Sequence, residues 1–173
     1  MHSLWEDAVA SMNLEQVNHV ERKPVLPIAF SLFHMAQIED GSAAMLGAGD
    51  LVYDEEWGKR IGLAIDDHGK HKSVDEMVEQ RIGDYGAYCD YQAQVFARTE
   101  SWLATLDDSV LDEVFLARPF PPMVATTYSA RVAGEEGMTK RDAIECWIYQ
   151  HGLRHMGEVE HARALVGLQG MTS

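Results

Sequence analysis

The sequence is short of the residues that build disulfide-stabilised or membrane-spanning proteins. It holds only two cysteines, Cys89 and Cys146, and both lie inside helical patterns. Two thiols cannot form a disulfide framework, so we expect them to be reduced, as in the cytoplasm. No run approaches the roughly 20 apolar residues of a transmembrane helix, and the first residues, MHSLWEDAVASMNLEQ, lack the apolar core of a secretory signal. We therefore expect a cytoplasmic protein without a membrane partner.

Basic residues are also scarce. Fourteen Lys and Arg stand against 28 Asp and Glu, which gives a formal net charge of −14. This balance disfavours nucleic acid and anionic membrane surfaces as partners, because both require a basic surface. No glycine-rich nucleotide-binding loop is present either. The length of 173 residues fits one domain, which we expect to span residues 1–173.

What the sequence does contain is helical periodicity. In the first part of the chain, Ser3 and Glu6 form a capping-box pattern, so we expect a helix from there that ends before Pro24. A strongly apolar helix should begin at Pro27 and end at Gly47.

The second half predicts two more helices separated by an irregular stretch. Residues 48–72 are expected to be a polar connection with a helical turn near Trp57. A capping box at 73–76 should open a helix of about 30 residues. Three prolines then interrupt residues 115–138, where MVATTYSARV could form a short strand or two. The last helix should run from Thr139 to Gly167. We therefore predict an all-α, up-down four-helix bundle with a mostly irregular connection before the last helix.

The last helix carries an unusual pair of histidines. Its core-facing stripe contains His151 and His155, one helical turn apart. A hydrogen-bonded pair in the core is one interpretation, but buried imidazoles must satisfy their ring nitrogens, and a shared metal ion does so directly. The zinc-protease motif H-E-x-x-H has the same spacing. Here Gly152 replaces its glutamate, which excludes that class.

A metal site with an open coordination position usually takes a third protein ligand. His34 is the obvious candidate, because it lies in the most apolar helix, which a bundle can place against the last helix. Alone, it would more readily be a satisfied core histidine. Glu158 follows on the edge of the same face as the pair. It is a candidate fourth ligand, hydrogen-bond acceptor or proton-transfer group, or else a solvated helix acid.

The other polar candidates have weaker support. Gln37 lies one turn after His34 and could accept a hydrogen bond there. His161 is about 240° around the helix from His155 and should face elsewhere. His68 and His71 belong to a polar loop, DDHGKHK, and are expected to be solvated. Tyr85 and Tyr91 of the third helix could line a pocket at the site, but aromatic residues at helical spacing are more often core residues, and we leave them out of the site.

With these residues identified, the chain resembles the DinB/YfiT-like superfamily. The segments PIAFSLFHMAQIEDG and YQHGLRHMGEVEHARALVGLQG are similar to the family's second and last helices, and YDEEWGKRIGL is similar to its tryptophan-containing connection. The resemblance implies a four-helix bundle, ligation of a divalent metal, zinc or nickel, by His34, His151 and His155, and a homodimer. Family members of known activity include transferases and isomerases that use low-molecular-weight thiols.

The expected function follows from this constellation. Three neutral histidines would leave the charge of the metal available to lower the pKa of a bound thiol or water. We expect a metal-dependent transferase that joins a small thiol to an electrophilic compound, with Glu158 as the candidate for proton transfer. A metal-dependent hydrolase is the alternative within catalysis. A non-catalytic, metal-stabilised bundle or a ligand-binding protein is the alternative outside it.

Overall fold

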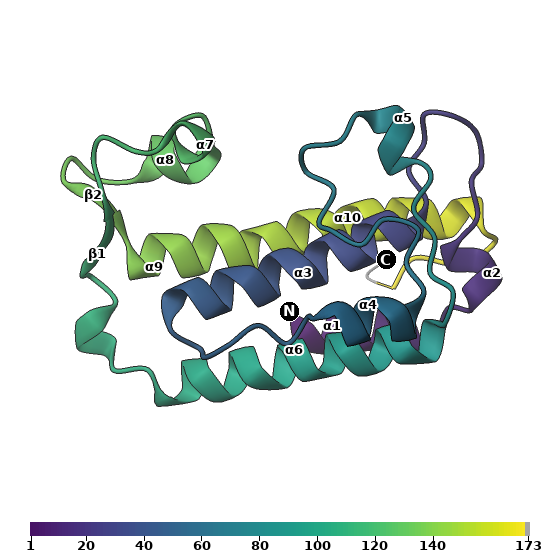
Figure 1. Ribbon diagram of the computed structural model, residues 1–173, viewed down its shortest axis with the longest axis horizontal. Helices are drawn as coiled ribbons and strands as arrows, with labels where there is room; N and C mark the ends of the chain where they lie inside the picture. Colours follow the sequence, from purple (N-terminus) through teal and green to yellow (C-terminus); the bar gives the residue numbers. More distant parts are fainter. Residues whose placement is uncertain (172–173) are drawn as a thin grey trace.

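A computed structural model describes residues 1–171 of the chain. Its three long helices are α3 (Ile28–Leu46), α6 (Tyr85–Thr105) and α10 (Gln150–Leu165). Figure 1 shows α3 between α10 and α6, and the shorter α1 (His2–Ala10) lies against α6. The prediction of an all-α bundle is confirmed. In the described part of the chain, no helix combines the length and apolar character needed to cross a membrane.

Helix α3 begins and ends as its sequence predicts. Pro27 has extended backbone angles and directly precedes the first helical residue, Ile28. At the other end Gly47 adopts a left-handed conformation with φ of +107°, which residues with a Cβ rarely adopt, and its N–H bonds the last turn. The expected turn near Trp57 is also present, as α4 (Glu55–Ile61), whose N-terminus is capped by the Asp54 side chain.

The first predicted helix is wrong in its extent and its cap. Met1, not Ser3, precedes α1, and no side chain caps this helix. The chain leaves the helix after Ala10, and a separate short helix, α2 (Leu14–Val17), follows. Its N-terminus is a capping box in which the Asn13 and Gln16 side chains each accept the other's backbone N–H. This local hydrogen bonding competes with helix continuation and restarts the chain in a new direction.

The long third helix of the prediction is divided in two. The capping box at Ser73 is confirmed and opens α5 (Val74–Met77), but α6 begins only at Tyr85, with Asp84 as its cap. Between them, Gly83 lies against the end of α4, where its N–H bonds the carbonyl of Ile61. Periodicity cannot reveal this contact, because its partner is more than twenty residues away in the sequence.

The connection before the last helix contains more helix than expected. Strands β1 (Val114–Ala117) and β2 (Gly137–Thr139) pair antiparallel, so strand content is minor. A 3₁₀ turn (Asp108–Val110) precedes them. Between the strands lie α7 (Pro122–Ala125) and α8 (Tyr128–Val132), at the end of the bundle in Figure 1. The expectation of strands within MVATTYSARV is therefore wrong, because Thr127 caps a helical turn there by accepting the N–H of Ala130.

The last helix starts where predicted but is not uniform. Thr139 and Asp142 form the expected capping box and open α9 (Lys140–Ala143). A π-helical segment, Ile144–Tyr149, then leads directly into α10. A π-helical turn holds more residues than an α-helical turn, so this segment adjusts which side chains of α10 face α3.

The core between α3 and α6 contains a buried ion pair. Asp40 on α3 is fully buried and lies 2.8 Å from Arg98 on α6. The same carboxylate accepts the backbone N–H groups of Val52 and Tyr53, and so fixes the chain that leaves α3. Tyr91, which is also fully buried, directs its hydroxyl to Asp40, which places this aromatic residue in the core as expected.

We predict that Asp40→Ala lowers the free energy of unfolding by about 3–5 kcal/mol, because it leaves the Arg98 charge and two backbone donors without their acceptor. Urea denaturation measures this change. Asp90→Ala is the matched control, since Asp90 pairs with Arg60 at the exposed surface and should contribute about 1 kcal/mol or less. Equal effects of the two substitutions would contradict the role assigned to the buried pair.

Candidate metal centre

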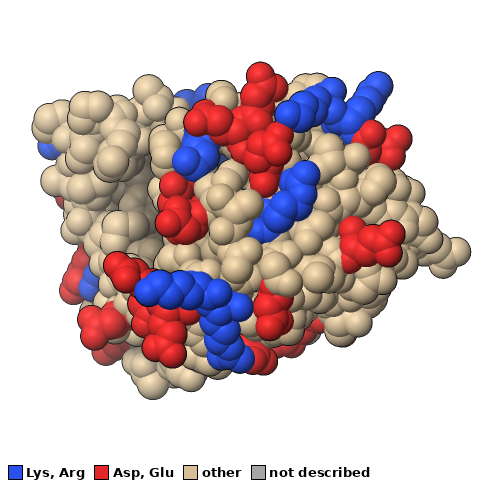
Figure 2. All heavy atoms as spheres, turned by 45° about the vertical axis from the view of Figure 1, so that its right-hand side comes forward, with Lys and Arg blue, Asp and Glu red and all other residues tan. Residues whose placement is uncertain are grey.

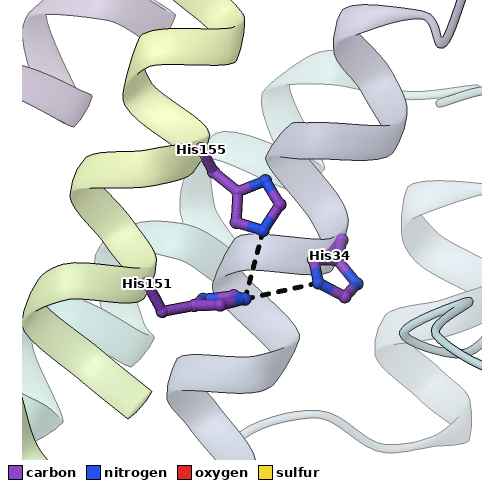
Figure 3. Close-up of side chains that lie close together, drawn as sticks. All are labelled: His34, His151 and His155. Carbon is purple, nitrogen blue, oxygen red and sulfur yellow. Dashed lines mark hydrogen bonds between the residues drawn. The ribbon is translucent and has the colours of Figure 1, made fainter. Parts of the chain in front are cut away.

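Three histidine side chains converge between α3 and α10. Figure 3 shows His34 from α3 facing His151 and His155 from α10. The Nε2 atom of His151 lies 3.3 Å from Nε2 of His34 and 3.1 Å from Nε2 of His155. One nitrogen from each ring lies within 4.8 Å of the others. The structure thus brings together the three residues that the sequence suggested as ligands.

The helices position these side chains through ordinary core packing. Buried Ile148, in the π-helical segment, and buried Val159, on α10, lie on the same stripe as the two histidines, and both elements pack against α3. On α3, His34 stacks on Phe30 with ring centroids 5.5 Å apart. The rings therefore meet because two amphipathic faces pack, and they are held at a helix interface where neighbouring side chains limit their rotation.

The spacing of the nitrogens fits a divalent metal. With metal–nitrogen bonds of about 2.0–2.1 Å, two ligands of a tetrahedral ion lie roughly 3.3 Å apart. The two Nε2 separations, 3.1 and 3.3 Å, are close to this value.

The hydrogen-bond partners of the rings give a second, independent argument. His34 donates its Nδ1–H to the backbone carbonyl of His68, and His155 donates its Nδ1–H to the carboxylate of Glu158. In a neutral imidazole the other nitrogen then carries only a lone pair, so both Nε2 atoms are acceptors. His151 Nε2 can donate one proton to only one of them. A metal cation can accept the lone pairs of all three nitrogens. Metal coordination therefore satisfies the three histidines better than hydrogen bonds among them do.

Burial keeps two of the rings in the form that binds metal. It lowers the pKa of His34 to about 4, against the opposing effect of the hydrogen bond to His68. It also lowers the pKa of His151 to about 2, assisted by the positive charge that His155 and His34 would carry when protonated. Both side chains are therefore neutral near pH 7, which leaves a lone pair available for coordination.

Glu158 lies behind His155 relative to the cluster. Its Oε2 accepts from His155 Nδ1 at 2.7 Å and from the Ser31 hydroxyl at 2.9 Å. Burial works to raise the pKa of Glu158, but the hydrogen bonds from His155 and Ser31 hold it below its ordinary value. The carboxylate is thus on the opposite edge of the ring from Nε2, where it fixes the tautomer of His155. No local sequence pattern indicates the role of Ser31, because its contact with Glu158 joins two helices.

Among the remaining candidates, His161 is exposed and is not one of the converging histidines. The buried Oε1 of Gln37 has no hydrogen-bond partner among residues 1–171, so the predicted hydrogen bond of this side chain near His34 is not observed. His2, the first residue of α1, is buried between Glu39 and Glu100, and stacks on Phe96. Its pKa is raised, because these carboxylates outweigh the effect of burial.

The loop with His68 and His71 contains a second group of candidate ligands, together with Asp67. Their polar atoms already have partners within the loop. Asp67 accepts the N–H of Gly69 at 2.6 Å, and its other oxygen lies 3.6 Å from the Lys72 ammonium. His68 Nδ1 accepts the N–H of Lys70. These contacts stabilise the loop and leave the group less suited to a metal than the three converging histidines.

We predict that the protein binds about one zinc or nickel ion per chain, and that His34→Ala, His151→Ala and His155→Ala each weaken binding strongly. His161→Ala is the control, because it changes an exposed histidine of the same helix. Metal analysis after equilibrium dialysis measures the stoichiometry. Equal binding by wild type and the His151→Ala/His155→Ala double variant would refute the assignment.

Acidification should destabilise the metal-free protein between pH 6.5 and about 4. In this window the unfolded chain protonates His34 and His151 while the folded chain does not, so stability falls with pH by up to about 1.4 kcal/mol per unit for each group. His2 acts oppositely, but its contribution is complete below its unfolded pKa of about 6.5. Denaturation as a function of pH tests this, with His34→Gln/His151→Gln expected to flatten the profile. A flat wild-type profile from pH 7 to 5 would contradict it.

Comparisons with known proteins give the fold but not a family. No protein-family model and no curated protein matches the sequence. Among solved structures, a conserved protein from Enterococcus faecalis is similar to this chain, with a TM-score of 0.73 and 18% sequence identity. The alignment covers 96% of this chain and 91% of the other. The architecture therefore occurs in an experimentally determined structure, and at this identity the likeness concerns the fold alone.

Proposed function

We propose that this protein is a DinB/YfiT-like metalloprotein that transfers a small thiol to an electrophilic compound. The observation that carries the proposal is the convergence of three imidazole nitrogens, which the protein cannot all satisfy by hydrogen bonds among themselves. The helical bundle supports it, because the superfamily that the sequence resembles places such histidines on two facing helices.

In this proposal His34, His151 and His155 hold one divalent ion. Imidazole donors suit zinc and nickel, which are the metals we expect. Bound by three neutral ligands, such an ion would supply Lewis acidity and lower the pKa of a thiol or water beside it. Glu158 does not close the site as a fourth ligand in the observed arrangement, because its oxygen bonds the opposite edge of the His155 ring.

The other residues of the chain have supporting roles. Glu158 keeps the Nε2 lone pair of His155 directed at the cluster, and its side chain is 55% exposed, so it can also exchange a proton with solvent. The cysteines are poor nucleophiles here, since burial raises the pKa of both thiols, Cys89 and Cys146. The nucleophile should therefore be a thiol brought by a cosubstrate. A cytoplasmic homodimer remains our expectation for the whole molecule.

Hydrolysis is the nearest alternative activity, because the same histidines would serve it with water in place of a thiol. Hydrolysis and thiol transfer would use the same metal ligands and would differ only in the nucleophile. A purely structural metal site has less support, since structural zinc takes four protein ligands, and no fourth His, Cys, Asp or Glu joins the cluster within residues 1–171.

We predict that zinc- or nickel-loaded protein conjugates low-molecular-weight thiols to activated electrophiles, measured by consumption of thiol and by mass spectrometry of the adduct. His151→Ala should lower kcat/KM by roughly two orders of magnitude or more, because it removes a ligand of the ion. Glu158→Gln keeps an acceptor for His155 but not the negative charge, and should lower metal affinity or activity by about 10–100-fold.

His161→Ala and the metal-free protein are the controls for this assay. Thiol conjugation at the wild-type rate in His151→Ala would remove the metal from the mechanism. Ester hydrolysis without thiol conjugation would establish the hydrolase instead. Absence of both reactions in protein with a full complement of metal would leave a non-catalytic metal-binding bundle.

A further inference from the structure

His2, the first residue of α1, has a carboxylate at each of its two ring nitrogens. Its Nδ1 lies 2.8 Å from the Glu100 carboxylate of α6, and its Nε2 lies 2.9 Å from the Glu39 carboxylate of α3. The ring also stacks on Phe96 of α6, with centroids 4.0 Å apart and planes 7° from parallel. A neutral imidazole carries a proton on only one nitrogen, whereas an imidazolium carries one on each. This arrangement therefore favours the protonated ring.

Glu39 depends on the charge of this ring, because the carboxylate is buried. Acids outnumber bases two to one in the chain, and Figure 2 shows acidic side chains distributed over the face it presents. A carboxylate at such a surface is stabilised by water, but the side chain of Glu39 is only 1% exposed. Among residues 1–171, no group donates a hydrogen bond to either of its oxygens. A buried charge without a partner is strongly destabilising, so the His2 imidazolium is needed to compensate it.

The charged groups that act on the His2 ring come from two different helices. Burial works to lower the pKa of His2, but Glu39 of α3 and Glu100 of α6 together raise it above its ordinary value. Asp40, the next residue of α3, pairs with Arg98 instead. Glu100 is 63% exposed, so the ring can exchange its proton with water from that side.

The start of α1 also contacts α10. Met1, which precedes α1, packs on Gly152, where an added Cβ would lie 2.3 Å from the Met1 sulfur. Gly152 carries no charge and directly follows His151, one of the candidate metal ligands. A movement of the first turn of α1 would therefore uncover α10 beside the candidate metal centre.

We propose that the His2 imidazolium is a pH-sensitive switch that holds the start of α1 on the bundle and releases it at alkaline pH. Loss of the ring proton leaves Glu39 buried without a counter-charge, and water can reach this carboxylate only if the first turn of α1 moves away. A histidine whose pKa is raised by folding stabilises the protein fully below its unfolded pKa of about 6.5. That stabilisation is lost as the pH rises through the folded pKa.

The inference is independent of the proposed function, because the switch uses none of the candidate metal ligands. Two of these ligands, His34 and His151, have lowered pKa values of about 4 and about 2, so they do not titrate at alkaline pH.

Two measurements on the whole chain test the switch. NMR of protein with labelled histidine follows the protonation of the His2 ring. Hydrogen exchange, corrected for the intrinsic effect of pH on exchange, follows the opening of α1 between about pH 7 and 9, above the unfolded pKa of histidine. In the wild type we expect α1 to open with the same midpoint as the loss of the His2 proton, while exchange within α6 stays slow.

Three variants make the test specific. Glu39→Gln removes the buried charge, so it should lower the midpoint of the His2 titration by about one pH unit or more and make the opening of α1 independent of pH in this range. Glu100→Gln removes the exposed carboxylate and should lower both midpoints together, by a smaller amount. His19→Gln is the matched control, since His19 pairs with Glu21 at the exposed surface, and it should change neither midpoint.

The outcomes decide the proposal even if Glu39→Gln does not fold. Joint movement of the two midpoints in Glu100→Gln would support the switch. A midpoint for the wild-type His2 ring at or below about 6.5 would overturn it, because the carboxylates would then not stabilise the imidazolium. So would an α1 that stays closed above the midpoint of the His2 titration, or one that opens with a pH dependence that does not follow the His2 ring.

Discussion

The packing of α3 against α10 is the interaction on which the candidate site depends. It brings His34 to within 3.3 Å of a nitrogen on His151, a residue 117 positions away in the chain. Neither helix carries the site alone, since one contributes a single ring and the other a pair. At the same interface, the Ser31 hydroxyl of α3 donates a hydrogen bond to Glu158 of α10. Glu158 in turn accepts from Nδ1 of His155, so the contact between the helices also helps to orient the His155 ring. The three histidines are therefore brought together by the same packing that forms the bundle.

The features that depend only on neighbouring residues could be predicted from the sequence. The spacing of His151 and His155, the end of α3 at Gly47 and the caps at Ser73 and Thr139 each depend on residues within one or two helical turns. The pairing with His34 required one further assumption, that the most apolar helix faces the last helix. The bundle architecture, which the similarity to a solved structure also supports, made that assumption sound.

The parts that depend on distant contacts could not be predicted. The break before α6 reflects the contact of Gly83 with the end of α4, and the short helices between the strands depend on a hydroxyl cap at Thr127. The backbone carbonyl of His68 orients His34, yet a carbonyl has no side-chain signature in a sequence. Ser31 and the π-helical segment before α10 could not be predicted for the same reason, because the role of each depends on contacts with the facing helix.

The separation of the ligands along the chain has a consequence for folding. An ion held by His34 and the two histidines of α10 would close a loop of more than one hundred residues between the second and last helices of the core. A crosslink of that length restricts the unfolded chain in the way a long-range disulfide does, and a ligand that binds only the folded state shifts the equilibrium further with its concentration. Both cysteines of the sequence, Cys89 and Cys146, lie within the described residues and are free thiols there. The metal would be a reversible crosslink of this chain, because it can be removed by chelation or acid and restored without any redox chemistry.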